Sequence, residues 1–228
     1  MRGDRKCRPV HEQFLDSRRV PPTDRADLTR IRPISRPMQP IIPIRRKEPF
    51  DGDGWLFELK LDGFRGLANT VNGRMLSKKG CRLLSKNGCR LRRFEPLLDA
   101  LPPGFVFDGE IVALDRDGRP RFNDLLFGRR EPVYVLVTVG EDVRALPLKE
   151  RKALLEKVVR RHRMQRSEPV LGDGKAAFRA ACGLDLEGIV AKRLGDAYSP
   201  ATRWWKIVNK NYSQKLRRAE LFDRRRVG

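Results

Sequence analysis

The stretch WLFELKLDGFR, residues 55–65, places charged side chains at alternate positions of an apolar run. Side chains two residues apart along a strand share one face of the strand. The spacing therefore predicts that Glu58, Lys60 and Asp62 project into a common space, with the following glycine turning the chain ahead of an arginine. The charged outer face of an edge strand has the same pattern, so this stretch alone leaves both interpretations open.

Three further segments place charged side chains inside apolar runs: Asp108 and Glu110 in FDGE (107–110), Glu187 and Lys192 in LEGIVAKR (186–193), and Lys206 in WWKIV (204–208). A charged group inside an apolar strand is costly unless it is paired or binds a metal. Each segment alone has an ordinary explanation, such as a buried salt bridge. Four such segments in one chain instead predict a shared polar site.

The surrounding pattern predicts an α+β fold with largely antiparallel sheets, because strands and helices alternate without a regular βαβ rhythm. The clearest element is an amphipathic helix over residues 148–162. An Asn-Gly pair at residues 72–73 predicts a hairpin turn. The expected strands span 55–60, 64–71, 105–115, 134–139, 188–192 and 204–208, and a further helix spans 94–101.

Lysine and arginine number 50 against 29 acidic residues, which gives a formal net charge of +21. Such a surplus favours a polyanionic partner, and nucleic acid is the first candidate. A genomic base composition that favours arginine codons is the alternative explanation. The 4 cysteines form no C-x-x-C pair, so neither a zinc site nor a disulfide framework is expected. No membrane span or signal peptide is indicated, and a cytosolic location is expected.

The chain is expected to divide into three parts. Residues 1–47 form a basic, proline-rich arm with 13 basic and 5 acidic residues, largely disordered except for apolar residues between Met38 and Ile44 that pack beside the domain. A folded domain spans 48–212, and a basic tail spans 213–228. The tandem repeat LSKKGCRL-LSKNGCRL (76–91) predicts a lengthened hairpin, either a phosphate-contacting finger or a solvated loop.

Together the four segments resemble the signature of the covalent nucleotidyltransferases, which are DNA ligases, RNA ligases and mRNA capping enzymes. That signature is K-x-D-G-x-R, D-G-E, E-G-[IV]-x-x-K and W-x-K-x-K. The chain reads Lys60-Leu-Asp62-Gly63-Phe-Arg65, Asp108-Gly109-Glu110, Glu187-Gly188-Ile-Val-Ala-Lys192 and Trp204-Trp205-Lys206-Ile-Val208. In and around these motifs, the sequence is most similar to the bacterial ATP-dependent DNA ligases of the end-joining repair type, over about residues 38–222.

The resemblance implies a nucleotidyltransferase (ATP-grasp-like) domain of mostly antiparallel sheets flanked by helices. It implies that Lys60 takes AMP from ATP, that AMP passes to the 5′-phosphate of nicked DNA, and that a 3′-hydroxyl then seals the strand. An attacking amine must be uncharged, a state that nearby cations and desolvation favour. The implied Mg²⁺ ligands are Glu110 and Glu187. The implied nucleotide-binding residues are Glu58, Asp62, Gly63, Arg65, Lys192 and Lys206.

The resemblance also implies partners and a location. Nicked double-stranded DNA is the expected substrate, and a Ku-type end-binding protein or a separate OB-fold chain are the expected associates. The expected roles are DNA repair and recombination by non-homologous end joining. The bacterial cytosol or nucleoid, without membrane contact, is the expected location.

The chain departs from the family pattern in several places, one of which is Ser85-Lys86-Asn87-Gly88, where the family typically has Ser-Arg-Asn-Gly. The family's aromatic-Asp-Leu-Leu strand reads YVLVTV here (134–139), so the ring that stacks on adenine is absent unless Tyr134 replaces it. Val208 stands where the last motif has its second lysine, and Lys210 is a partial replacement. Only 18 residues follow Lys210, too few for the family's OB-fold domain. A fragment, a stand-alone adenylation domain and a decaying copy are all consistent with this.

Two alternatives to a DNA ligase remain open at this point. An RNA ligase or a capping-type guanylyltransferase shares the signature, and a preference for nicked RNA or for GTP distinguishes these enzymes. A catalytically impaired, DNA-binding remnant of a ligase is the alternative from a different class. Salt-dependent DNA binding without a lysyl-AMP adduct distinguishes such a remnant.

Overall fold

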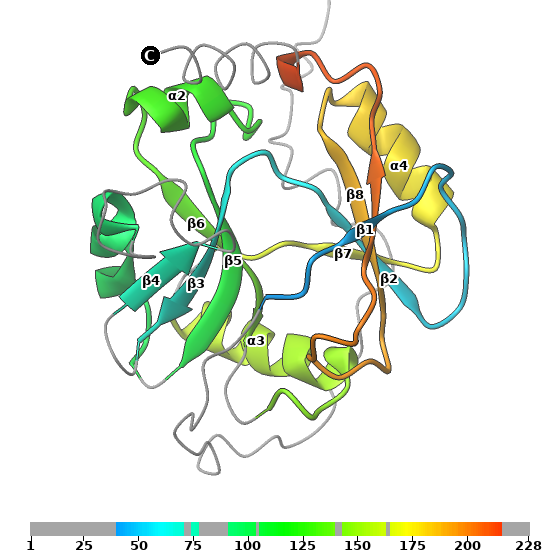
Figure 1. The fold of residues 1–228 in the computed structure, drawn as a ribbon, viewed down its shortest axis with the longest axis horizontal. Coiled ribbons are helices and arrows are strands. Elements are labelled where there is room, and N and C mark those ends of the chain that lie inside the picture. The colour runs from blue at the N-terminus through cyan, green and yellow to red at the C-terminus, as the bar shows by residue number, and fades with distance from the viewer. Residues whose placement is uncertain are drawn as a thin grey trace, which may run out of the picture.

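Two sheets form the frame of the molecule in the part of the chain that the computed structural model describes, residues 40–70, 74–77, 91–103, 105–139, 143–162 and 165–215. One sheet has the strand order β1-β9-β8-β2-β7 and the other has the order β4-β3-β5-β6. Figure 1 shows the two sheets on opposite sides of the molecule, with β2 leading from one sheet into β3 of the other.

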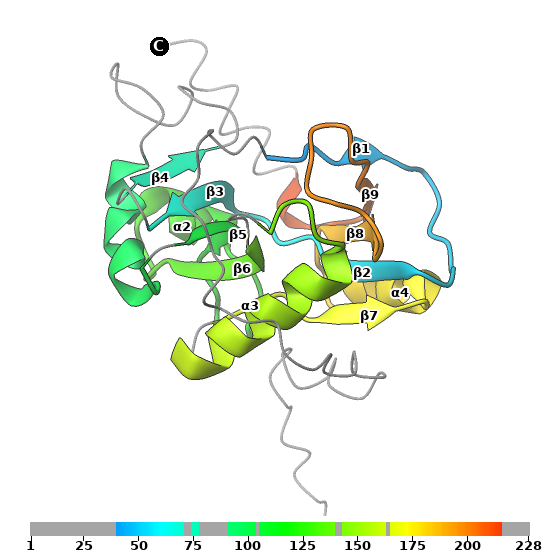
Figure 2. The same ribbon diagram turned by 90° about the horizontal axis from the view of Figure 1, so that it is seen from below.

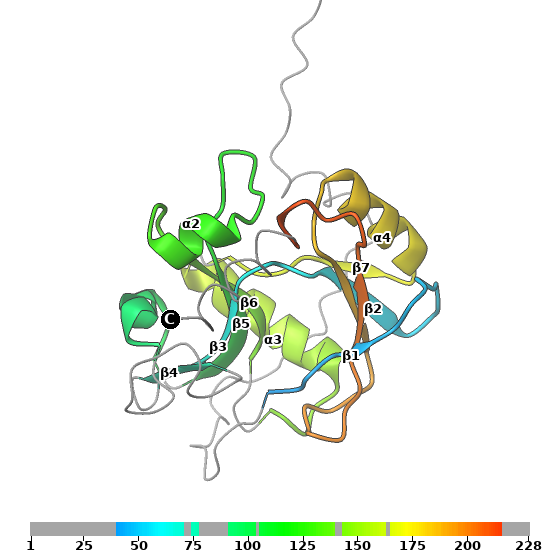
Figure 3. The same cartoon turned by 45° about the horizontal axis from the view of Figure 1, so that its top comes forward.

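The first sheet collects strands from both ends of the described chain: β1 (Ile44–Arg45), β2 (Trp55–Leu59), β7 (Pro169–Leu171), β8 (Gly188–Arg193) and β9 (Trp205–Val208). The β1–β9 pair is parallel and the other pairs are antiparallel. Helix α4 (Gly174–Gly183) covers the outer face of this sheet (Figure 3). Phe57, Ala181 and Ile189 are fully or almost fully buried between helix and sheet.

The second sheet is antiparallel throughout: β3 (Phe64–Asn69), β4 (Arg74–Ser77), β5 (Val106–Val112) and β6 (Val133–Val139). A 3-10 helix, η3 (Arg92–Ala100), and a short helix, α2 (Phe122–Phe127), lie beside it. The larger apolar core lies here, where the ring of Phe64 contacts the rings of both Phe94 and Phe122.

Helix α3 (Leu148–His162) connects the two halves of the molecule. Its apolar side chains Leu155, Val158 and Val159 are buried in the core of the second sheet. The amide of Lys149, near its first turn, donates to the carbonyl of Leu194 just after β8, at 3.0 Å. Figure 2 shows α3 running beneath both sheets, which explains how one amphipathic helix contributes to the site between them.

The α+β class with mostly antiparallel sheets is confirmed, and the helix over 148–162 has the predicted bounds. The helix predicted over 94–101 is a 3-10 helix that begins at Arg92 and contains Pro96. No strand or helix was predicted for β1, β7, α2 or α4. The hairpin turn at 72–73 and most of the tandem repeat lie outside the described residues, although β3 and β4 pair as a hairpin requires.

The boundary expected between arm and domain at residue 47 requires correction. Ile41 is only 2% exposed and packs with Leu67, Tyr198 and Trp204, and β1 pairs with β9. Residues 40–47 therefore belong to the folded domain and not to the arm. The apolar residues between Met38 and Ile44 were expected to pack beside the domain, and Ile41 does so. Met38 itself lies outside the described residues. Within the described ranges, no helix is long and apolar enough to cross a membrane.

Candidate active site

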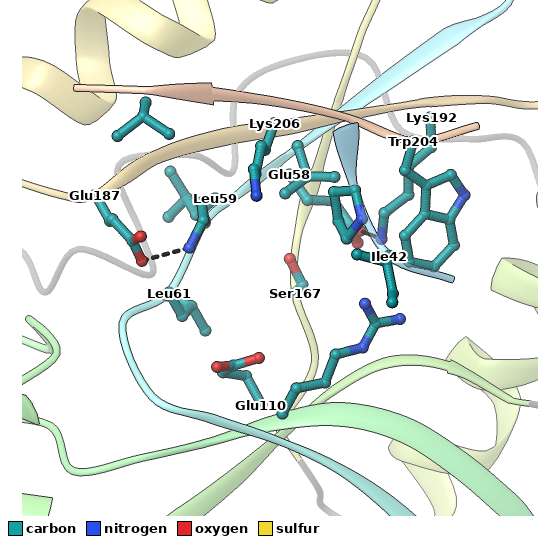
Figure 4. Close-up of a pocket in the computed structure, with 15 residues that line it drawn as sticks. Ile42, Glu58, Leu59, Leu61, Glu110, Ser167, Glu187, Lys192, Trp204 and Lys206 are labelled. Carbon is teal, nitrogen blue, oxygen red and sulfur yellow. Dashed lines mark hydrogen bonds and ion pairs between the residues drawn. The ribbon is translucent and has the colours of Figure 1, made fainter. Parts of the chain in front are cut away.

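A cavity of about 420 Å³ opens between the two sheets, within the range of about 300–1,000 Å³ that is usual for small-molecule sites. Figure 4 shows its charged side chains pointing inward from several strands. The residues that line it are Ile42, Pro43, Glu58, Leu59, Lys60, Leu61, Arg65, Glu110, Ser167, Glu187, Val190, Lys192, Trp204, Lys206 and Val208.

The cavity brings together most of the side chains that the four sequence segments predicted: Glu58, Lys60, Arg65, Glu110, Glu187, Lys192 and Lys206. Asp62 and Gly63 do not line it. Strand β2 ends at Leu59 and the chain then bends, so the strict alternation of faces fails beyond Lys60. Asp62 instead lies buried and accepts a hydrogen bond of 3.1 Å from the Tyr212 hydroxyl.

Gly63 and Gly188 allow the strands around the cavity to approach closely. A Cβ on Gly63 would lie 2.2 Å from the carbonyl oxygen of Ile111 in β5. Gly188 has a φ of 139°, and a Cβ there would lie 2.0 Å from the carbonyl oxygen of Ile207 in β9. Both glycines therefore act through the backbone rather than by touching the contents of the cavity.

Lys60 pairs with Glu187 at one end of the cavity. The lysine Nζ lies 2.5 Å from the glutamate Oε2, and the two side chains are 22% and 16% exposed. The backbone holds both groups, because the Lys60 amide donates to the carbonyl of Gly188 at 2.8 Å and the Asn209 amide donates to that of Glu187 at 2.9 Å. The Lys60 amine is therefore partly accessible to solvent and lies in direct contact with a carboxylate.

Glu58 lies at the other end of the cavity, together with Lys192 and Trp204 (Figure 4). Its two carboxylate oxygens each accept from a different lysine, Oε1 from Lys152 and Oε2 from Lys192. All three side chains are at most 6% exposed. Burial alone would raise the pKa of Glu58, but the two ammonium groups outweigh it and lower that pKa. Burial lowers the pKa of Lys192 to about 8 although Glu58 opposes the shift.

Arg65 is held from three directions. Its Nε donates to Asp108 Oδ1 at 2.8 Å, its Nη2 donates to Asp108 Oδ2, and its Nη1 donates to the carbonyl of Ile41 at 2.5 Å. The Tyr198 hydroxyl donates to the same carboxylate at 2.9 Å. Burial would lower the pKa of Arg65, but Asp108 outweighs it and raises that pKa, while burial and Asp108 together raise the pKa of Tyr198.

The last sequence segment lines the cavity through Trp204, Lys206 and Val208. The Lys192 ammonium lies 4.2 Å from the centre of the Trp204 ring, a cation–π contact. Val208 lies in the lining, where the family pattern has a lysine. Lys210 does not line the cavity; it is exposed and borders a smaller neighbouring hollow, which Val208 also lines.

The possibility that Tyr134 supplies a stacking ring is wrong. Tyr134 is 6% exposed in the core of the second sheet, and its hydroxyl lies 2.9 Å from the carbonyls of both Gly66 and Phe107. Its ring packs against Gly109, on the far side of β5 from the cavity lining at Glu110. The aromatic residue that does line the cavity is Trp204.

The carboxylates of Glu110 and Glu187 are the oxygen groups that suit a magnesium ion in this cavity. Within the described residues, no three histidine, cysteine or acidic side chains cluster as a complete metal site. Magnesium commonly uses only one or two protein carboxylates and completes its shell with water and substrate phosphates. The donor set therefore fits a magnesium ion that arrives with a nucleotide.

Two residues that sequence reasoning missed support the site from outside the four segments. Lys152 comes from α3 and Tyr198 from the loop between β8 and β9. A signal for Lys152 was present, since it lies four residues after Leu148 and three before Leu155, on the apolar stripe of the predicted helix. A lysine on an apolar stripe requires a buried partner.

Known proteins are similar to this chain in sequence and in fold. The family model for the ATP dependent DNA ligase domain matches residues 41–208. The multifunctional non-homologous end joining protein LigD of Pseudomonas aeruginosa is 36% identical over 159 residues, which cover 63% of this chain and 18% of that protein. The SPbeta prophage-derived DNA ligase-like protein LigB of Bacillus subtilis is 29% identical over 185 residues, covering 75% of this chain and 67% of LigB.

Solved structures agree with these relatives. The ligase domain of LigD from M. tuberculosis superposes with a TM-score of 0.60 at 26% identity, covering 74% of this chain and 60% of that one. A mycobacterial DNA ligase D complexed with ATP and MES gives 0.59 at 26% identity, covering 75% of this chain and 60% of that one. The cavity lies within the matched span. The chain belongs to the ATP-dependent DNA ligase domain family, as the adenylation domain, and is similar to the LigD end-joining ligases.

Proposed function

We propose that the chain forms a covalent lysyl-AMP from ATP, with Lys60 as the nucleophile, as the adenylation step of DNA ligation. The observation that carries the proposal is the cavity itself. It places an accessible amine among the cations Arg65, Lys192 and Lys206 and beside two carboxylates. A relative of this fold was solved with ATP, which supports the choice of nucleotide.

The reaction exchanges one bond to phosphorus for another. The uncharged amine of Lys60 attacks the α-phosphorus of ATP, so that an N–P bond forms while the bond to the bridging oxygen of pyrophosphate breaks. The lysine must first lose a proton, because only an uncharged amine has the electron pair that attacks phosphorus. Glu187 is the carboxylate paired with this amine, and it relays the proton to water as the nucleotide enters, which leaves its own oxygens ionised.

The cavity cations neutralise charge on the triphosphate. Lys206, Lys192 and Arg65 reach the cavity from three different strands, which lets them contact separate phosphate oxygens. Magnesium, when bound, adds further charge neutralisation at the phosphates, and Glu110 and Glu187 are the residues that would hold it. Asp62 and Gly63 contribute indirectly, by shaping the bend that follows Lys60.

Glu58 marks the end of the cavity that takes the base. A carboxylate accepts hydrogen bonds and repels phosphate, so its site suits a base that presents an amino group. Glu58 and Lys60 are two positions apart in the sequence, which corresponds to a rise of about 6.6–6.8 Å along an extended chain. The base and the α-phosphate therefore occupy opposite ends of the same cavity. Ile42, Pro43 and Val190 add an apolar lining for the base and ribose.

The later steps of ligation are part of the same proposal. The formal charge of +21 suits a DNA backbone, and the names of the LigD relatives point to end joining. We propose nicked double-stranded DNA as the acceptor of AMP, in bacterial DNA repair and recombination in the cytosol or nucleoid. A Ku-type end-binding protein or a separate OB-fold chain are the proposed associates. The chain spans only about a fifth of LigD.

The test is transfer of label from ATP carrying radioactive phosphorus at the α-position. With magnesium, the protein should acquire an acid-labile AMP adduct that Lys60→Ala lacks and that Lys149→Ala, an exposed lysine on α3, retains. Labelling of Lys60→Ala at the wild-type rate would refute the assignment. Labelling from GTP in preference to ATP would favour a capping-type enzyme. Tight, salt-sensitive DNA binding with no adduct would favour an impaired remnant, an outcome that Val208 in the lining makes worth testing.

A further inference from the structure

We propose that Lys152, a residue of α3 outside every sequence segment of the site, is the positioning residue that gives Glu58 its selectivity for an amino-bearing base. The inference rests on the proposed function, because it assigns the base to the Glu58 end of the cavity. It adds a determinant of nucleotide choice from an element that contributes no residue to the cavity lining.

The contacts of Glu58 differ on its two sides. Lys192 donates to Oε2 and also lines the cavity, whereas Lys152 donates to Oε1 and does not line it. Lys152 therefore lies behind the carboxylate, where a ligand in the cavity does not reach it, with its side chain only 6% exposed. One lysine is accessible to a nucleotide and the other is a fixed part of the wall.

This difference allows the hydrogen bond from Lys192 to Glu58 to be exchanged while the one from Lys152 persists. A nucleotide that enters the cavity offers phosphate and sugar oxygens to the Lys192 ammonium and an amino group to a carboxylate oxygen. When Lys192 turns toward the nucleotide, Oε2 becomes available to accept from the exocyclic amine of adenine. Lys152 still holds Oε1, so Glu58 stays ionised and keeps its direction.

Without Lys152, the exchange would leave a buried carboxylate with no cation beside it. Such a group is strongly disfavoured, so Glu58 would keep Lys192 or take up a proton. Either response removes an acceptor oxygen from the base end. The neighbouring Arg151 does not replace Lys152, because its Nη2 donates to the carbonyl of Asp196 and its guanidinium lies 5.6 Å from the centre of the Tyr198 ring.

The experiment compares ATP with purine riboside triphosphate, which lacks the amino group at position 6. Lysyl-AMP formation gives kcat/KM for each nucleotide, and calorimetry gives their equilibrium affinities. The wild type should prefer ATP by about tenfold or more, the scale of one charge-assisted hydrogen bond. Lys152→Met should bring this ratio close to one, mainly by losing activity with ATP, while Lys152→Arg should preserve the preference.

Two controls separate positioning from stability. Lys157→Met, on the exposed face of the same helix, should leave the ratio unchanged. Glu58→Gln should lose the preference, and adding Lys152→Met to it should cause no further loss. If Lys152→Met fails to fold, as judged by circular dichroism, Lys152→Gln takes its place.

The outcomes distinguish the inference from the proposed function. A Lys152 variant that folds and keeps the wild-type ratio, or that loses both nucleotides equally, overturns the positioning role. A wild type that binds ATP but forms no adduct refutes lysyl-AMP formation. In that case the ratio of the two affinities, measured by calorimetry, still decides the role of Lys152.

Discussion

Replacement of Asp108 by asparagine is expected to destabilise the fold by breaking the buried ion pair with Arg65. Asp108 is fully buried and the Arg65 side chain is 9% exposed, so solvent screens this pair very little. The substitution keeps the shape and an oxygen for the Tyr198 hydroxyl but removes the charge. Arg65 would then remain buried beside a neutral amide, the carbonyl of Ile41 and the ring of Trp204, without its ion-pair partner.

Removing one partner of a buried pair typically costs about 3–5 kcal/mol. Domains of ordinary stability have about 5–15 kcal/mol in total, so Asp108→Asn uses a large share of it. With a urea m-value of about 3 kcal/mol per molar, the unfolding midpoint should fall by roughly 1–2 M. The melting temperature should fall by about 6–20 °C, given about 2–4 °C per kcal/mol at this chain length.

Urea unfolding followed by circular dichroism measures this loss, and Asp99→Asn, on the exposed side of η3, serves as the matched control. A double-mutant cycle with Arg65→Met tests the physical cause. If the two residues act as a pair, the double variant should cost little more than Asp108→Asn alone. A loss below about 1 kcal/mol, or two losses that simply add, would refute the pairing argument.

Three further outcomes are expected. Gly188→Ala should cost about 3 kcal/mol or more in urea unfolding, because its Cβ would meet the Ile207 carbonyl oxygen at 2.0 Å; a cost under about 1 kcal/mol contradicts this. The KM for ATP should rise several-fold from about pH 7 to about pH 9, as Lys192 loses its charge near a pKa of about 8, and Lys192→Arg should flatten the rise. Unfolding does not explain the rise in KM. The pKa of Lys192 is lower in the folded protein than in the unfolded chain, so the folded protein gives up this proton first. Its contribution to the free energy of unfolding therefore becomes more favourable as the pH increases through about 8. Val208→Lys should lower the KM for ATP by adding an ammonium to the cavity beside Lys206, and an unchanged KM argues that the phosphates lie elsewhere.

The parts of the fold that could be predicted from the sequence are those with strong local signals. The apolar stripe of α3 repeats over fifteen residues, and its bounds were predicted correctly. By contrast β1 and β7 have two and three residues, too few for any periodicity, and they exist only because β9 and β2 offer partners. Pairing across the chain, rather than local propensity, determines such strands.

The candidate site shows the same division. The motif lysines and glutamates could be placed together, because they lie on strands or directly beside a strand end, where side-chain direction still follows from alternation. Asp62 could not, because the strand ends at Leu59 and the direction of a side chain in a bend depends on tertiary contacts. Tyr198 could not either, since its contact with Asp108 joins residues ninety positions apart.

Charge pairing explains how so many cations coexist in one cavity before a nucleotide binds. Lys60 pairs with Glu187, Lys192 with Glu58, and Arg65 with Asp108, so each of these three cations has an anion supplied by another segment of the chain. A triphosphate must therefore compete for cations that are already engaged. The competition differs among the three pairs, because Lys60 and Glu187 are partly exposed whereas Arg65 and Asp108 are buried. The exposed pair opens at the lowest cost, and it holds the amine that the proposed reaction requires.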